Sequence, residues 1–148
     1  MLNLWGMPDQ AYDIVRLAVA YLLAMPVGWH REKEAHSVGV RTFPLVAMAS
    51  CGYVLLARAS DPASQSRIIQ GLVAGMGFIG GGAILKSEGN VHGTAAAASI
   101  WTTGVLGAAV AQERYVVAIT IAAINLFTLR VLLPWKQKMD AGKPEKEP

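Results

Sequence analysis

The sequence has a single cysteine, Cys51, and it lies inside an apolar run. One cysteine permits no disulfide within the chain and excludes a metal site made of clustered cysteines. Charge is also scarce, since charged residues make up 16% of the chain, where a soluble domain carries about 25%. The formal net charge of +3 sits in short clusters between apolar runs. This argues against a nucleic-acid partner, which needs a basic face on a folded surface.

Signatures of catalysis are missing as well. The chain has no Gly-x-Ser-x-Gly, no His-Glu-x-x-His and no phosphate-binding loop that ends in Lys-Ser or Lys-Thr. A Gly-x-Gly-x-x-Gly match at residues 75–80 lies in an apolar run, without the strand and turn of a dinucleotide site. We therefore expect no enzymatic activity and no cofactor. The first basic residue is Arg16, so the N-terminus lacks the positive start of a secretory signal peptide, and we expect its apolar stretch to be retained.

Apolar runs are what the sequence has in abundance, with 53% hydrophobic residues. A helix needs about 20 such residues to cross a bilayer. Five runs approach the required length: residues 11–29, 40–57, 68–85, 94–111 and 116–133. The second, third and fifth of these runs are the clearest. The fourth is alanine-rich, carries two threonines and would need protein neighbours. The sequence therefore predicts an all-α, polytopic membrane bundle of about five helices. Its transmembrane domain covers residues 1–133, and a charged, disordered tail covers 134–148.

Lys and Arg are divided unequally between the two sides of such a bundle. The side that includes the C-terminus carries nine: Arg31, Lys33, Arg41, Lys86, Arg130, Lys136, Lys138, Lys143 and Lys146. The other side carries three: Arg58, Arg67 and Arg114. Because cytoplasmic loops are enriched in Lys and Arg, this distribution predicts a cytoplasmic C-terminus and an N-terminus outside.

Small residues recur at helical spacing along the predicted spans. The fourth span has Ser99, Thr103, Gly107 and Ala111 on one face, and such faces are typical of helix–helix contacts in membranes. In the third span, five of the eight residues from 75 to 82 are glycine: Gly75, Gly77, Gly80, Gly81 and Gly82. They favour a packing surface. The alternative is a break in the helix that exposes backbone carbonyls to an ion or a cavity, since glycine weakens helices.

Charged residues within the first span are candidates for function. Asp13 and Arg16 lie three apart, so they can pair on one helix face, either toward the bundle interior or toward water at the span end. Glu32, beside Glu34, follows the same span and could offer hard oxygen ligands to a divalent cation. Asp13 and Glu32 are the metal candidates, with Mg²⁺ as a possible ligand or substrate. A solvated charge cluster is the alternative for Glu32.

Other polar residues lie at the ends or in the middle of spans. Arg41, Arg67 and Lys86 are at span ends, where interfacial anchoring is their expected role. Asn125 is near the middle of the fifth span, and its amide needs a polar partner on another helix. His92, in the third loop, could titrate near neutral pH, although a lone loop histidine is usually part of the surface.

Three blocks of sequence resemble the MgtC/SapB family of bacterial inner-membrane proteins. The first, residues 28–32 and 39–46, is similar to the family's G-x-E-R-E and G-[LV]-R-T-x-x-L-V patterns. The second and most specific is Arg67-Ile68 followed by residues 75–85, and the third runs from Val91 to Trp101. The chain departs from the family at His30, where an acidic residue is usual, and at His92, where arginine is usual.

The resemblance implies five spans, a cytoplasmic C-terminus and a place in the bacterial inner membrane. It also implies roles in growth at low Mg²⁺, in acid stress and in virulence. It identifies this chain as a short member, without the cytoplasmic C-terminal domain of longer ones. Two hypotheses remain. The first is a regulator that contacts other membrane proteins, for which the resemblance suggests the proton-translocating ATP synthase, or that self-associates. The alternative is a Mg²⁺ transporter.

Overall fold

The structure, a computed structural model, describes residues 9–34, 39–58, 60–87 and 90–132. The predicted tail lies outside these residues. In chain order the elements are α1 (Asp9–Glu34), α2 (Thr42–Ala57), α3 (Pro62–Gly82), β1 (Leu85–Ser87), β2 (Asn90–His92), α4 (Thr94–Ala111), α5 (Tyr115–Phe127) and the π-helical turn η1 (Thr128–Leu132). The predicted all-α class is confirmed. A short hairpin is added to it, in which Leu85 pairs with His92 where a simple loop was predicted.

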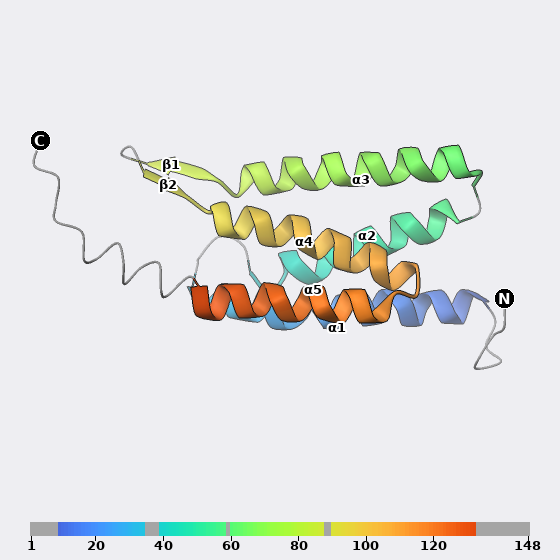
Figure 1. Ribbon diagram of the computed structural model, residues 1–148, viewed down its shortest axis with the longest axis horizontal. Coiled ribbons are helices and arrows are strands. Elements are labelled where there is room, and N and C mark those ends of the chain that lie inside the picture. The colour runs from blue at the N-terminus through green and yellow to red at the C-terminus, as the bar shows by residue number, and fades with distance from the viewer. Residues whose placement is uncertain (1–8, 35–38, 59, 88–89, 133–148) are drawn as a thin grey trace, which may run out of the picture.

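The five helices run back and forth along one long axis (Figure 1). One end, here called the hairpin end, collects the end of α1, the start of α2, the β-hairpin and the end of η1. The opposite end, here called the link end, collects the start of α1, the α2–α3 link and the α4–α5 link. Successive helices therefore alternate in direction, as a polytopic membrane bundle requires.

Local sequence explains where α3 begins. The Asp61 carboxylate accepts hydrogen bonds from the backbone N–H groups of Ala63 and Ser64 (3.0 and 3.1 Å), and Pro62 occupies the first helical position. This N-cap satisfies donors that would otherwise lack partners. The hydrogen bond from the Ser64 hydroxyl is the main reason that the pKa of the Asp61 carboxyl is lowered. Because of this cap, α3 begins six residues before the predicted start of the third span.

Three of the described helices are long and apolar enough to cross a membrane: Ala11–Lys33, Thr94–Ala111 and Tyr115–Leu132. The prediction that the second and third runs are clearer spans than the fourth is wrong by this measure. The helix α2 is apolar but only 16 residues long. The helix α3 begins with a polar turn and is rich in glycine. Glycine lengthens the helix but contributes little to its mean hydropathy. The expectation that the fourth span needs protein neighbours is confirmed, because α4 packs against α1, α2, α3 and α5.

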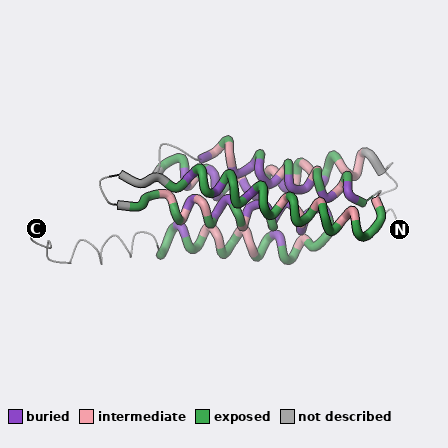
Figure 2. Tube along the Cα trace, turned by 90° about the horizontal axis from the view of Figure 1, so that it is seen from above, coloured by how far each residue is buried: buried purple, intermediate pink, exposed green. Residues whose placement is uncertain are grey.

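Burial is concentrated along α4 and the faces turned toward it. Buried residues gather in the interior of the bundle, and exposed ones lie along its outside (Figure 2). The predicted face of Ser99, Thr103, Gly107 and Ala111 is buried along its whole length. At Gly107 the backbones of α4 and α2 approach so closely that a Cβ added there would collide with the carbonyl oxygen of Ala47. Small residues thus position the central helix, as expected where lipid supplies no hydrophobic drive between helices.

The glycine-rich part of α3 does not match either prediction fully. The helix is unbroken from Pro62 to Gly82, so the broken-helix alternative is wrong for this structure. Gly80 does pack against another helix, since a Cβ there would lie 3.2 Å from the carbonyl oxygen of Ala97 on α4. A Cβ on any of the others would meet nothing within 4 Å: Gly71, Gly75, Gly77, Gly81 and Gly82. Most of these glycines are therefore left uncovered by the described part of the chain.

We expect Gly107→Ala to destabilise the bundle by about 1–3 kcal/mol, the usual cost of overpacking a core. A methyl group at this position meets rigid backbone at Ala47. Gly104→Ala should cost less, because the clashing atoms belong to the flexible side chain of Met76. Thermal unfolding in detergent can be followed with a thiol-reactive dye, since the one cysteine, Cys51, is buried and becomes accessible on unfolding.

Gly81→Ala is the matched control for this comparison. Nothing within 4 Å meets its added methyl group, and alanine favours helix by about 1 kcal/mol over glycine. Its melting temperature should be equal to or above that of the wild type. A Gly107→Ala protein that melts with the wild type would contradict the close α2–α4 contact.

Candidate functional site

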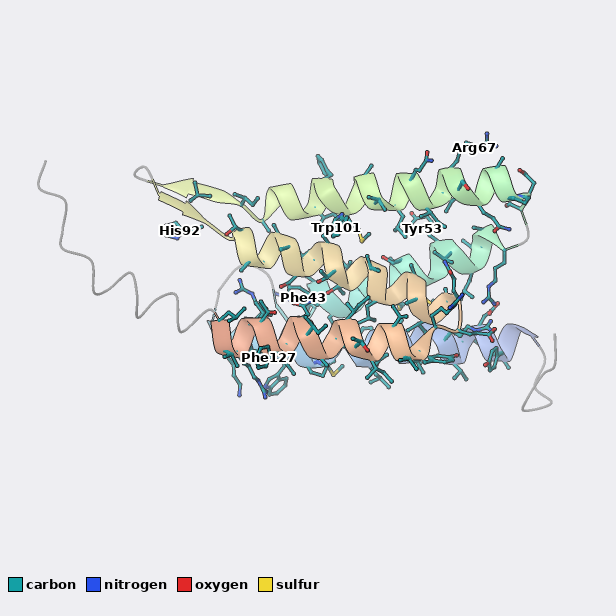
Figure 3. The ribbon with its side chains drawn as sticks, in the orientation of Figure 1. Phe43, Tyr53, Arg67, His92, Trp101 and Phe127 are labelled. Carbon is teal, nitrogen blue, oxygen red and sulfur yellow. The ribbon has the colours of Figure 1, made fainter. Side chains whose placement is uncertain are left out.

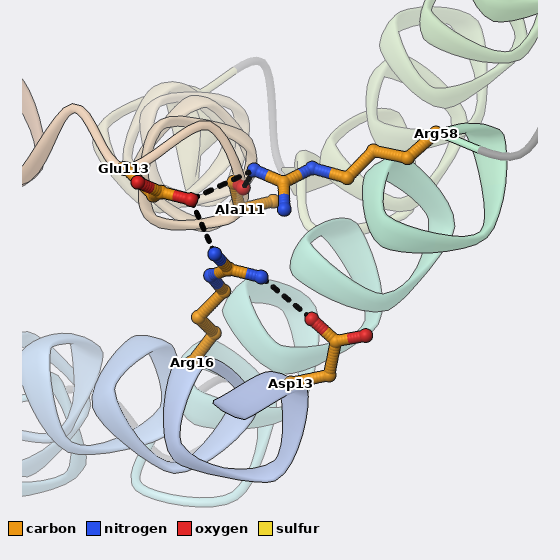
Figure 4. A network of polar contacts seen from close by, with 5 residues as sticks. All are labelled: Asp13, Arg16, Arg58, Ala111 and Glu113. Carbon is orange, nitrogen blue, oxygen red and sulfur yellow. Dashed lines mark hydrogen bonds and ion pairs between the residues drawn. The ribbon is translucent and has the colours of Figure 1, made fainter. Parts of the chain in front are cut away.

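A network of four charged side chains lies at the link end of the bundle (Figure 4). Arg16 donates to the carboxylates of Asp13 (2.7 Å) and of Glu113. Arg58 also reaches Glu113 (3.6 Å), and it donates to the backbone carbonyl of Ala111. The network therefore ties together α1, the end of α2 and the link between α4 and α5.

The positions of these side chains follow from local structure. Asp13 and Arg16 are one turn apart on α1, where residues three apart share a face. Arg58 caps the end of α2 and so extends beyond it toward the α4–α5 link. Glu113 is the one non-glycine residue with positive φ (61°) among the described residues, because the link reverses direction within three residues. That reversal turns the Glu113 carboxylate back over Arg16.

Arg16 is 6% exposed, although it carries a permanent charge. An arginine at the centre of a membrane costs about 2.5–3.5 kcal/mol on insertion scales. Here the two carboxylates offset that cost, while their own side chains stay 44% and 43% exposed toward the end of the bundle. The Tyr12 ring adds a cation–π contact at 4.0 Å. Of the predicted pair, Arg16 is therefore buried inside the bundle, while Asp13 stays partly exposed at its end.

The two candidate metal ligands are engaged by donors of the chain itself. Asp13 binds Arg16, and Glu32 accepts a hydrogen bond from the Val40 backbone N–H (3.0 Å). Gly39 leaves room for this carboxylate, because a Cβ there would collide with Glu32 Oε2. Asp13 and Glu32 are 19 positions apart on one helix, about 28 Å. Within the described part of the chain, no three His, Cys, Asp or Glu side chains are close enough together to hold a metal ion.

Asn125 has the interhelical role predicted for it. Its Nδ2 donates to Thr102 Oγ1 (2.9 Å), and its Oδ1 accepts from the Ser99 hydroxyl (2.9 Å). Both partners belong to α4, so the amide joins α5 to the central helix. Hydrogen bonds of this kind replace water as the partner of a polar group inside a membrane.

The remaining predicted residues are not brought together. Arg67 is at the start of α3, where it donates to the Ser64 hydroxyl (3.0 Å), and His92 ends β2 at the other end of the molecule (Figure 3). Arg41 precedes α2 and is exposed. Lys86 lies in β1, and its side chain is outside the described part of the chain, as is that of Glu34.

Two members of the network, Arg58 and Glu113, were not among the predicted site residues. From the sequence, Arg58 enters only the count that predicts topology, and Glu113 has no predicted role. The available signal was the run Gln112-Glu113-Arg114, which places charged residues between two apolar spans. Because the network joins residues 97 positions apart, only the packing of α1 against the α4–α5 link reveals it.

Comparison with known proteins places this chain. A family model described as MgtC family matches residues 17–138. The chain belongs to the MgtC family. Among curated relatives, protein SrpB of Synechococcus elongatus is 34% identical over 77% of this chain and 71% of its own length. Protein MgtC of Salmonella typhimurium is 34% identical over 64% of this chain and 41% of its own. "Putative magnesium transporter YhiD" of Escherichia coli is 30% identical over 80% and 59%.

Membership in the MgtC family agrees with the helical, multi-pass architecture. The match includes Arg58, Glu113 and Asn125 but begins one residue after Arg16. The aligned part spans about two fifths of the MgtC relative and three fifths of YhiD. No solved structure is significantly similar to this chain.

We expect Arg16 and Glu113 to be energetically coupled. Arg16→Gln and Glu113→Gln should each lower stability by about 1–2 kcal/mol, below the cost of breaking a fully buried pair because the carboxylate is partly exposed. The double variant should lose about 1 kcal/mol less than the two single losses together. Thermal unfolding in detergent measures all three.

Arg114→Gln is the control. It removes the same positive charge as Arg16→Gln, at a position next to Glu113 in the sequence, but Arg114 is exposed. It should unfold like the wild type. Strictly additive effects of Arg16→Gln and Glu113→Gln would show that the two side chains do not interact.

Proposed function

We propose that this protein is a regulatory protein of the bacterial inner membrane. In this proposal it acts in adaptation to low Mg²⁺ by binding another integral membrane protein through α3. Its role is not enzymatic. The link to magnesium rests on membership in the MgtC family, one of whose relatives is named for magnesium transport. The mode of action rests on the exposed face of α3.

One observation carries this proposal. Ala74, Gly77 and Gly81 are spaced by three and four residues, so they share one face of α3, and all three are exposed. Glycine and alanine let helix backbones approach closely, which is how membrane helices associate. No part of the described chain covers this face at Gly77 or Gly81. A helix of a second protein therefore has a complementary surface to pack against.

The carboxylates also favour regulation over transport. A Mg²⁺ path needs acidic oxygens free to replace part of the ion's water shell. Asp13 and Glu113 bind arginine, and Glu32 binds the backbone of the α1–α2 connection. Each of these groups thus has a structural role, which supports the regulator rather than the transporter.

The orientation in this proposal follows the excess of Lys and Arg. The hairpin end, with Arg41 and the end of η1, faces the cytoplasm, and the link end with Arg16 and Glu113 faces outside. The alternating directions of the five helices support this arrangement, since they bring the lysine- and arginine-rich connections to the same end.

Growth at low Mg²⁺ tests the proposal in a bacterium that lacks its own member of the family. The doubly substituted Gly77→Leu, Gly81→Leu protein should insert and fold like the wild type, because both positions are open, yet fail to restore growth. Ala123→Leu, an equivalent enlargement on the exposed surface of α5, should restore it. Full rescue by the double variant would contradict a role for the α3 face.

Purified protein in liposomes that contain a Mg²⁺-sensitive dye tests the alternative. The proposal predicts no saturable Mg²⁺ uptake above that of empty liposomes. Uptake that is saturable and disappears in Asp13→Asn or Glu32→Gln would establish a transporter and overturn the regulatory proposal.

A further inference from the structure

A second surface of α3 has a different chemistry from the small-residue face. Between α2 and α3 lies an open groove of about 800 Å³. Its walls are apolar and include Leu45, Gly75 and Phe78, and Arg41 lies at its hairpin end. Leu45 and Phe78 are 51% and 85% exposed, so the groove opens sideways, toward lipid in a membrane.

We propose that this groove binds an anionic phospholipid, with an acyl chain between α2 and α3 and the phosphate at Arg41. This proposal is independent of the regulatory function. It rests on the shape of the groove, on the charge at its end and on the depth of that charge.

The groove is long, and backbone forms part of one of its walls. It extends along α2 from Arg41 to Tyr53, which is twelve residues or about 18 Å. Gly71 and Gly75 line the groove without side chains, and a Cβ on either would meet nothing within 4 Å. An extended acyl chain can therefore lie against the α3 backbone.

The charge at the end of the groove is available to a phosphate. Arg16 and Arg58 bind Glu113, and Arg67 binds Ser64. By contrast, Arg41 has no hydrogen-bond or ion-pair partner for its guanidinium among residues 9–34, 39–58, 60–87 and 90–132. Arginine matches phosphate oxygens with two parallel N–H donors.

The depth of Arg41 fits a lipid headgroup. It directly precedes α2, whose apolar residues begin at Phe43, so its guanidinium lies where the helix leaves the hydrocarbon region. A phospholipid has its phosphate at this level and its acyl chains below it. Along the groove, the cationic Arg41 comes first and the apolar walls follow. Along a phospholipid, the phosphate comes first and the acyl chains follow, so each part of the lipid would meet a matching part of the groove.

Native mass spectrometry of the full chain in detergent tests this proposal, with phosphatidylglycerol and phosphatidylcholine of identical acyl chains as probes. We expect about a fivefold preference for phosphatidylglycerol, the effect of one basic residue at an anionic surface. Arg41→Gln should abolish the preference but keep weak binding of both lipids. Gly75→Leu should fill the groove and reduce the binding of both.

Two controls match these variants. Arg67→Gln removes an arginine from the other end of α3, outside the groove, and Ala123→Leu enlarges an exposed residue of α5. Both should bind lipid like the wild type. The proposal is overturned if Arg41→Gln keeps the preference or if Gly75→Leu binds as well as the wild type. It is equally overturned if a dimer appears that Gly75→Leu dissociates, because the groove would then belong to a second copy.

Discussion

The close approach of α4 to α2 at Gly107 is the contact on which the rest of the bundle depends. Lipid tails are as apolar as leucine side chains, so membrane helices gain stability from close packing rather than from escaping water. At Gly107 the α4 backbone lies against the Ala47 carbonyl, with no space for a side chain. That approach puts α4 in the centre, in contact with every other α-helix, and the position of the α4–α5 link follows from it.

The charged network is a consequence of that position. Glu113 can reach Arg16 only because α4 ends beside the first turns of α1. Without Glu113, the buried guanidinium of Arg16 would be left with Asp13 and the tyrosines Tyr12 and Tyr115 to offset the loss of water. At the hairpin end, the Glu32 carboxylate holds the α1–α2 connection in place by accepting a hydrogen bond from the Val40 backbone N–H. Gly39 allows this close approach because it has no side chain. Polar contacts thus fasten both ends of an apolar bundle.

The helix α3 stands apart from this arrangement. Only Met76 and Gly80 are buried among its residues, and its glycines are largely open. Apart from Gly80, the glycines are therefore unnecessary for packing among the described residues, yet they make the helix entropically weaker. Two surfaces explain their presence better. The face of Ala74, Gly77 and Gly81 suits a neighbouring helix, while Gly71 and Gly75 open the groove that ends at Arg41.

Apolar runs and local signals in the sequence determined the helices themselves. The bounds of α4, the cap at Asp61, the Asp13–Arg16 pair and the need of Asn125 for a partner all follow from residues near one another in the chain. Only the tertiary structure decided which partner Arg16 has on another helix and which glycines are covered. Those outcomes depend on contacts between helices, and helical spacing defines the faces of one helix but not which neighbour each face meets.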